Sequence, residues 1–157
     1  MNKKILIVAA AMMVACVAGV FAFGIGIQGG YNLGVPGNVA ITFKLDSVPL
    51  IFAGNFYIGD HLFALGLTGD YWILNDNIVG PLNWFIGAGA GVTIAIPDEG
   101  DMGLWASARV PIGLNMFLAK DFVEPYIQIV PALALHFSPS FNVDFDLDAN
   151  IGLRLWF

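Results

Sequence analysis

The sequence predicts an all-β fold: an eight-stranded antiparallel up-and-down transmembrane β-barrel, preceded by a cleaved signal peptide. Three observations predict it. After residue 22, eight segments alternate apolar with polar or small residues at a period of two. Hydrophobic residues make up 58% of the chain and charged residues only 11%, which is too little charge for a surface that faces water on all sides. The last alternating segment ends on a phenylalanine, Phe157.

The first 22 residues have the pattern of a secretory signal peptide. Lys3 and Lys4 precede an apolar run, and Val20-Phe21-Ala22 offers small residues at the usual cleavage spacing. We expect cleavage after Ala22, which leaves a single barrel domain at 23–157.

An alternative processing route remains open at Cys16, the only cysteine. In that reading Met13-Val14-Ala15-Cys16 is a lipobox and Cys16 becomes an acylated N-terminus, although methionine is atypical at the first lipobox position. Without other cysteines, neither disulfides nor thiolate metal sites are expected.

The charge balance excludes one class of partner. The formal charge is −6, and removing residues 1–22 leaves 6 − 2 = 4 basic against 12 acidic residues. Nucleic-acid binding needs clustered lysine and arginine, so nucleic acid is not an expected partner.

The last segment shows the alternation most clearly. From Asp144 to Phe157 every odd position from Phe145 is apolar, and acids, amides, Gly152, Arg154 and Trp156 occupy the even positions. The eight expected strands cover residues 23–33, 38–45, 50–58, 61–73, 83–96, 104–118, 122–137 and 144–157. The links between them are short and rich in turn residues, such as Asp46-Ser47-Val48-Pro49 and Asn75-Asp76-Asn77. Short links indicate antiparallel neighbours, and an even strand count places both chain ends on one side of a membrane.

The orientation of the two strand faces separates a barrel from a soluble sandwich. Eight such strands could pack their apolar sides into a core, but four basic residues are too few for the polar face to serve as a protein exterior. A closed barrel resolves this, because it pairs every backbone group in lipid and turns its apolar face outward.

A helical membrane protein is the other structural alternative. Residues 79–96 form an apolar stretch long enough to span a membrane, but this stretch contains Gly80, Pro81 and three further glycines. Pro111, Pro125 and Pro131 count against a barrel, since proline cannot donate to a strand ladder, and we expect bulges there.

Aromatic residues are expected at the two membrane interfaces. One predicted rim contains Trp72, Trp84, Phe122 and Trp156, and the other contains Phe63, Trp105, Phe137 and Phe141.

Residues 23–157 resemble the OmpA/OmpX-type small barrels of Gram-negative outer membranes. The alternating run Gly152-Leu153-Arg154-Leu155-Trp156-Phe157 looks like the signal read by the barrel-assembly machinery, with Leu153, Leu155 and Phe157 as its residues. Together with Gly66-Leu67-Thr68-Gly69-Asp70-Tyr71-Trp72 and Arg109-Val110-Pro111-Ile112-Gly113-Leu114, it is also similar to an uncharacterised outer-membrane barrel domain family. The resemblance implies an outer-membrane location. It implies outer-membrane lipids, the assembly machinery and periplasmic chaperones as partners, and it allows a host or surface ligand.

Two groups of charged residues are expected inside the barrel. Near the periplasmic end, Lys44, Asp70, Glu124 and Arg154 form an interior charge cluster, with Glu124 and Arg154 as a cross-strand pair. An eight-stranded barrel is only wide enough for side chains to fill, so this cluster is interpreted as a plug of paired charges. A gated ion path is the alternative.

The outer lumen mouth is the second group. It contains Arg109, His136, Asp144, Asp146 and Asp148. Three alternate aspartates could hold a hard cation such as calcium, but a solvated acidic mouth is the preferred interpretation, and no metal or cofactor is predicted. His136 with Ser138 or Ser140 and Asp144 is a conceivable hydrolytic set, although Ser-Pro-Ser is ordinary turn chemistry.

The predicted function is that of a small integral outer-membrane barrel with a filled interior, in a structural or surface-interaction role. No enzymatic activity is predicted. The alternative is a narrow channel for small solutes or ions, for which the inner-face glycines of residues 83–96 leave some room.

Overall fold

The computed structural model describes residues 22–32, 37–59, 62–138 and 140–157. The predicted signal peptide and Cys16 lie outside these residues, Ala22 excepted. Cleavage and lipidation therefore stay predictions.

The described chain forms nine antiparallel strands. They are β1 (Phe23–Asn32), β2 (Asn38–Leu45), β3 (Leu50–Gly59), β4 (Leu62–Val79), β5 (Leu82–Pro97), β6 (Gly103–Arg109), β7 (Ile112–Met116), β8 (Val123–Ser138) and β9 (Asn142–Trp156). Strands β6 and β7 both lie between β5 and β8, so they are two halves of one barrel position. The predicted antiparallel barrel of eight positions is confirmed.

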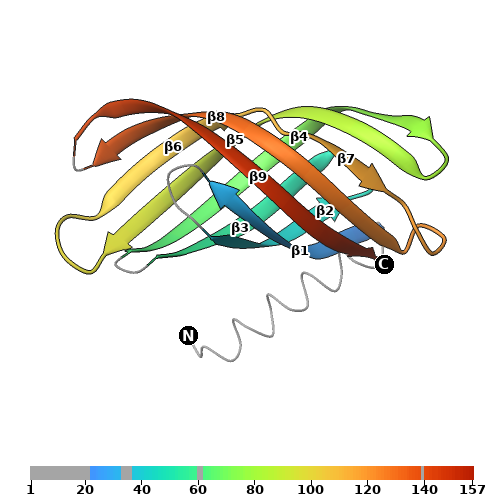
Figure 1. Ribbon diagram of the computed structural model, residues 1–157, viewed down its shortest axis with the longest axis horizontal. Coiled ribbons are helices and arrows are strands. Elements are labelled where there is room, and N and C mark those ends of the chain that lie inside the picture. Colours follow the sequence, from blue (N-terminus) through green and yellow to red (C-terminus); the bar gives the residue numbers. More distant parts are fainter. Residues whose placement is uncertain (1–21, 33–36, 60–61, 139) are drawn as a thin grey trace, which may run out of the picture.

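The first and last strands close the ring (Figure 1). At the end of the barrel that carries the C-terminus, the backbone N–H of Phe23 donates to Phe157 O at 3.1 Å, and the N–H of Phe157 donates to Phe23 O at 2.9 Å. A closed ring leaves no sheet edge along the barrel wall, so backbone groups there are paired without water.

The strands are staggered around the ring. A row of paired residues runs from Trp156 through Gly24, Lys44, Ile51, Asp70, Gly89, Arg109 and Ala132 to Asp146. The row thus returns to β9 ten residues before it began, since 156 − 146 = 10. Closing a sheet requires this shear, and it means that residues in one row climb the barrel axis.

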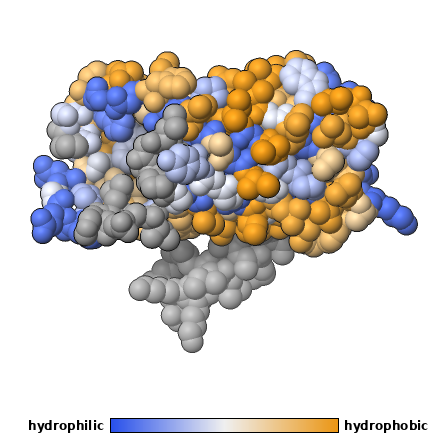
Figure 2. All heavy atoms as spheres, viewed as in Figure 1, coloured by the Kyte–Doolittle hydropathy of each residue, from blue (hydrophilic) through white to orange (hydrophobic). Residues whose placement is uncertain are grey.

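The two faces have the predicted polarity. Large apolar side chains such as Ile27, Leu67 and Ile151 point outward and are exposed, whereas Gln28, Asn55 and Glu124 point inward and are buried. Figure 2 shows apolar residues over much of one side and hydrophilic residues at the end that holds the β5–β6 loop. A soluble sandwich with an apolar core is therefore wrong for this chain.

The helical alternative is also wrong, because most of residues 79–96 lies in strand β5. In the part of the chain that the structure describes, no helix has the length and apolar character to span a membrane.

Strand β4 departs from its expected end. We expected a turn at Asn75-Asp76-Asn77, but β4 continues to Val79, and β4 and β5 extend as a long hairpin (Figure 1). The turn falls instead at Gly80, whose φ of 54° suits glycine, and the Asn77 side-chain amide donates to Gly80 O at 2.8 Å. Register shifts between Trp72 and Leu74 and between Asn77 and Val79 accommodate the longer strand.

Two of the four aromatics predicted for the rim at the C-terminal end lie on the other face of the wall. Trp72 is 3% exposed and stacks inside the barrel on Phe85, with ring centroids 3.8 Å apart. Trp156 also turns inward, and its indole N–H donates to Glu124. Both occupy the polar phase of their strands, because Thr68, Asp70 and Trp72 alternate in step, as do Arg154 and Trp156.

Pro111 and Pro131 are accommodated at an interruption and not by the bulges we expected, whereas Pro125 lies within β8 opposite Leu153. Strand pairing stops for two residues, Val110 and Pro111, between β6 and β7. Two residues lie opposite this gap in β5 and two in β8, so no residue is added as it would be in a bulge. Pro131 faces this gap, where its carbonyl accepts from the Val110 N–H at 3.0 Å. A proline cannot donate to a strand ladder, so its nitrogen is tolerated where the pairing is interrupted.

Candidate functional site

Glu124 is the centre of a buried charge cluster at the end of the barrel that carries both termini of the domain. The side chain is 0% exposed. Its Oε2 accepts from Arg154 Nη1 at 2.9 Å and from Trp156 Nε1 at 2.9 Å, and its Oε1 accepts from Asn115 Nδ2 at 2.8 Å. Lys44 Nζ lies 3.5 Å from Oε1. One carboxylate thus joins side chains from β2, β7, β8 and β9.

Aromatic rings fill the space around the two cations. Lys44 Nζ lies 3.9 Å from the centre of the Trp72 ring, and the Arg154 guanidinium carbon lies 4.1 Å from the centre of the Tyr126 ring. Cation–π contacts strengthen when water is excluded, as it is here. Charged heads and rings together fill this half of the lumen.

Asp70 is not part of the Glu124 cluster, which corrects the predicted four-residue set. Its Oδ1 lies 2.9 Å from Arg109 Nε, and both side chains are buried. We had placed Arg109 only at the outer mouth. Asp70 shares a paired row with Lys44, but the stagger of the strands lifts each step of that row along the axis, so Asp70 lies nearer to Arg109.

Glycines make room for these large interior side chains. A Cβ at Gly26 would collide with Arg154, and one at Gly152 would collide with the ring of Tyr126. The Tyr126 ring crosses Gly152, and its hydroxyl donates to Gln28 Oε1 on β1 at 2.9 Å. Interior glycines of β1, β5 and β9 therefore leave the space that large side chains of the neighbouring strands occupy.

The outer half of the lumen holds a polar cavity of about 440 Å³. Its lining includes all five residues predicted for the mouth, Arg109, His136, Asp144, Asp146 and Asp148. Tyr57 and Trp105 also line it, although neither was predicted for the mouth and Trp105 was expected at the outer aromatic rim. The sequence could have predicted both positions, because each residue alternates in phase with the interior residues of its strand.

The mouth residues are held by local contacts. His136 Nε2 lies 3.5 Å from Asp144 Oδ2, which also accepts from Asn142 Nδ2 at 2.8 Å. Ser138 Oγ donates to the backbone oxygen of Met102 at 2.8 Å. Within the described ranges, no group of three or more histidine, cysteine or acidic residues is arranged to hold a metal ion.

The terminal strand turns its predicted assembly residues outward. Leu153 and Phe157 are exposed, and Leu155 is half-buried between them. Phe157 is the middle of an outward row of rings: its centroid lies 5.7 Å from Phe23 and 5.7 Å from Phe122, and Phe23 lies 5.8 Å from Phe43. This row forms an aromatic band on the rim that carries both termini of the domain.

Comparison with solved structures finds small outer-membrane barrels. The N-terminal β-barrel domain of Pseudomonas aeruginosa OprF aligns with a TM-score of 0.61 at 14% identity, over 87% of this chain and 97% of that one. Neisserial surface protein A gives a TM-score of 0.61 at 15% identity, also over 87% and 97%. A major outer membrane protein from Thermus thermophilus gives 0.50 at 10% identity, over 88% and 100%.

No family model and no curated protein sequence matches the chain. The narrower resemblance to an uncharacterised domain family therefore stays a prediction. The structural likenesses, together with the apolar outer face of a closed barrel, place the protein in an outer membrane. The chain has the fold of the small OmpA/OmpX-type outer-membrane β-barrels.

Proposed function

We propose that this protein is a structural or surface-interaction barrel of the outer membrane whose interior is closed to solutes. The observation that carries the proposal is the cluster around Glu124. A carboxylate with 0% exposure that joins four donors from three other strands supports a lumen that is closed at this level. An eight-stranded lumen is narrow enough for such a cluster to fill.

The interior supports an anchoring role more than a catalytic one. The conceivable hydrolytic set of His136, Asp144 and either Ser138 or Ser140 needs a serine hydroxyl within reach of the imidazole. Of the two serines, Ser138 donates its hydroxyl to Met102 O instead. A structural or surface-interaction role needs neither a nucleophile nor a cofactor.

A narrow channel is the second candidate, and the outer cavity is the observation that favours it. This cavity of about 440 Å³ has polar walls and extends inward as far as Thr68 and Arg109. A channel would require the cluster at Glu124 to open.

Planar bilayer recording of the purified full-length protein tests the choice. A closed barrel is expected to give no discrete conductance steps in potassium chloride solution. The conductance of the unmodified protein is compared with that of Glu124→Gln, in which Lys44 and Arg154 lose their shared carboxylate. Regular openings of the unmodified protein that disappear on heat unfolding would contradict the proposal and favour the channel.

We also propose that Leu153, Leu155 and Phe157 are read by the barrel-assembly machinery, and that periplasmic chaperones carry the chain to it. The outward direction of Leu153 and Phe157 supports this, because a partner can reach them before the barrel closes against β1.

A further inference from the structure

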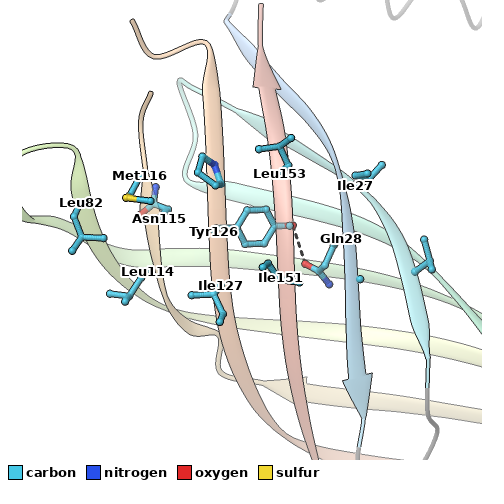
Figure 3. A pocket seen from close by; sticks show the side chains of 14 residues that line it. Ile27, Gln28, Leu82, Leu114, Asn115, Met116, Tyr126, Ile127, Ile151 and Leu153 are labelled. Atoms are coloured by element: carbon cyan, nitrogen blue, oxygen red, sulfur yellow. Dashed lines mark hydrogen bonds between the residues drawn. The ribbon is translucent and has the colours of Figure 1, made fainter. Parts of the chain in front are cut away.

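The lipid-facing surface is hollowed by an apolar groove of about 740 Å³ (Figure 3). Two outward rows of side chains bound it. One row contains Leu114, Ile127 and Ile151, which are paired across β7, β8 and β9, and the other contains Pro125, Leu153 and Ile27. The groove thus runs across the strands in the half of the barrel nearer the C-terminus.

Small residues make the groove. Gly29 continues the first row on β1 without a side chain, and a Cβ added there would meet only the backbone oxygen of Asn38, at 4.0 Å. Gly152 lies between the two rows on β9, and the Tyr126 ring backs it from inside the barrel, where it reaches Gln28 (Figure 3). The floor is therefore closed against the lumen.

The surroundings of the groove determine what can occupy it. The ring row Phe122, Phe157, Phe23 and Phe43 lies between the groove and the rim of the barrel. Aromatic bands mark the level of lipid headgroups, so the groove lies on the hydrocarbon side of that level. At this depth the groove is surrounded by lipid acyl chains, and an apolar groove of this size can hold one acyl chain.

A cation lies on the headgroup side of the same band. Of the basic side chains in the described ranges, Lys44, Arg109 and Arg154 are buried inside the barrel, and Lys120 is the one exposed to the outside. Lys120 lies in the turn between β7 and β8, which is closed by paired backbone bonds of 2.9 and 3.1 Å between Leu118 and Val123. These two strands supply Leu114, Pro125 and Ile127 to the groove.

We propose that the groove binds one glycerophospholipid of the periplasmic leaflet, with an acyl chain between the two rows and its phosphate at the Lys120 ammonium. The charge on Lys120 complements the phosphate, and the turn that carries Lys120 joins two of the strands that line the groove. The site does not depend on whether the barrel conducts.

Native mass spectrometry of the full-length protein in detergent tests the site, with dioleoyl phosphatidylglycerol and dioleoylglycerol as probes. The two probes share their chains and differ in the phosphate. We expect a saturable one-to-one adduct with both, tighter for phosphatidylglycerol. Gly29→Leu fills the groove and is expected to weaken both adducts about tenfold. Gly54→Leu is the matched control, because Gly54 has no atom within 4 Å of its added Cβ and lies outside the groove.

The headgroup contact has its own pair of variants. Lys120→Gln is expected to lower phosphatidylglycerol binding to the level of dioleoylglycerol and to leave dioleoylglycerol unchanged, whereas Asp121→Asn in the same turn should leave both unchanged. Each variant is first checked for heat-modifiable gel migration, which reports a folded barrel. Equal binding by Gly29→Leu and Gly54→Leu would overturn the proposal. So would undiminished phosphatidylglycerol binding by Lys120→Gln.

Discussion

Arg109 and Asp70 form their ion pair across Gly89. Asp70 on β4 and Arg109 on β6 are the two direct cross-strand partners of Gly89 on β5, and the distance of 2.9 Å between Arg109 Nε and Asp70 Oδ1 is reached over the bare glycine. A strand with any side chain at that position would separate the two charges. The glycine is therefore part of the ion pair.

Gly89→Ala is expected to destabilise the barrel by about 1–3 kcal/mol, because the added Cβ would collide with the Asp70 carboxylate. The midpoint of urea unfolding in micelles, followed by tryptophan fluorescence, measures the change. Gly54→Ala is the control, since its Cβ meets open space. Equal urea midpoints for the two variants would show that the ion pair between Asp70 and Arg109 does not require a glycine at position 89.

Glu124→Gln is expected to cost about 3–5 kcal/mol, because it leaves the buried cations Lys44 and Arg154 without their carboxylate. The temperature at which the folded gel band is lost should fall. Adding Lys44→Met should restore part of the loss, since one unpaired charge is then removed. Glu99→Gln, on an exposed loop residue, is expected to change nothing. If Glu124→Gln behaves like Glu99→Gln, the cluster does not hold the barrel together.

The turn between β7 and β8 carries three consecutive non-glycine residues with positive φ: Ala119 at 52°, Lys120 at 59° and Asp121 at 67°. Such a conformation costs about 1–2 kcal/mol for each residue with a Cβ. Ala119→Gly is therefore expected to raise the urea midpoint. Ala90→Gly, in the middle of β5, should lower it. A fall in both variants would mean that the turn is unstrained.

Phe157→Ala is expected to reduce the amount of heat-modifiable protein in outer-membrane fractions, because Phe157 ends the proposed assembly signal and contacts Phe23 and Phe122. Phe145→Ala provides a matched control, since Phe145 is an outward residue of the same strand with 64% exposure against 61% for Phe157. Quantitative immunoblotting of membrane fractions compares them. An equal loss in both would point to general lipid contact instead of a terminal signal.

The strand positions were largely predictable, because the period of two is a local property of the sequence. Strand β2 has the predicted bounds, and β1 and β3 end within one residue of theirs. The end of β4 was not predictable in this way. The register shift after Trp72 lets the chain extend past a turn-like Asn-Asp-Asn, and a bulge leaves no periodic signal.

The sequence predicts which side chains face the lumen, but not how far along the barrel axis each of them lies. All nine charged or histidine side chains proposed for the lumen lie in the inward phase of their strands, yet Asp70 was assigned to the Glu124 cluster and pairs instead with Arg109. The position of a side chain along the barrel axis depends on the stagger between strands. This stagger amounts to ten residues around the ring, and only the closed ring defines it. Gly89 opposite both Asp70 and Arg109 was the available clue, but it requires the register first.

The closed interior is tested most directly by thiol labelling of intact cells with a membrane-impermeant maleimide. Ser107→Cys lines the outer cavity, and Thr42→Cys lies at the level of the Glu124 cluster with 1% exposure, both in a Cys16→Ser background. Ser107→Cys should label within minutes, and Thr42→Cys only after unfolding by heat in detergent. Labelling of Thr42→Cys in intact cells at the rate of Ser107→Cys would contradict a closed barrel.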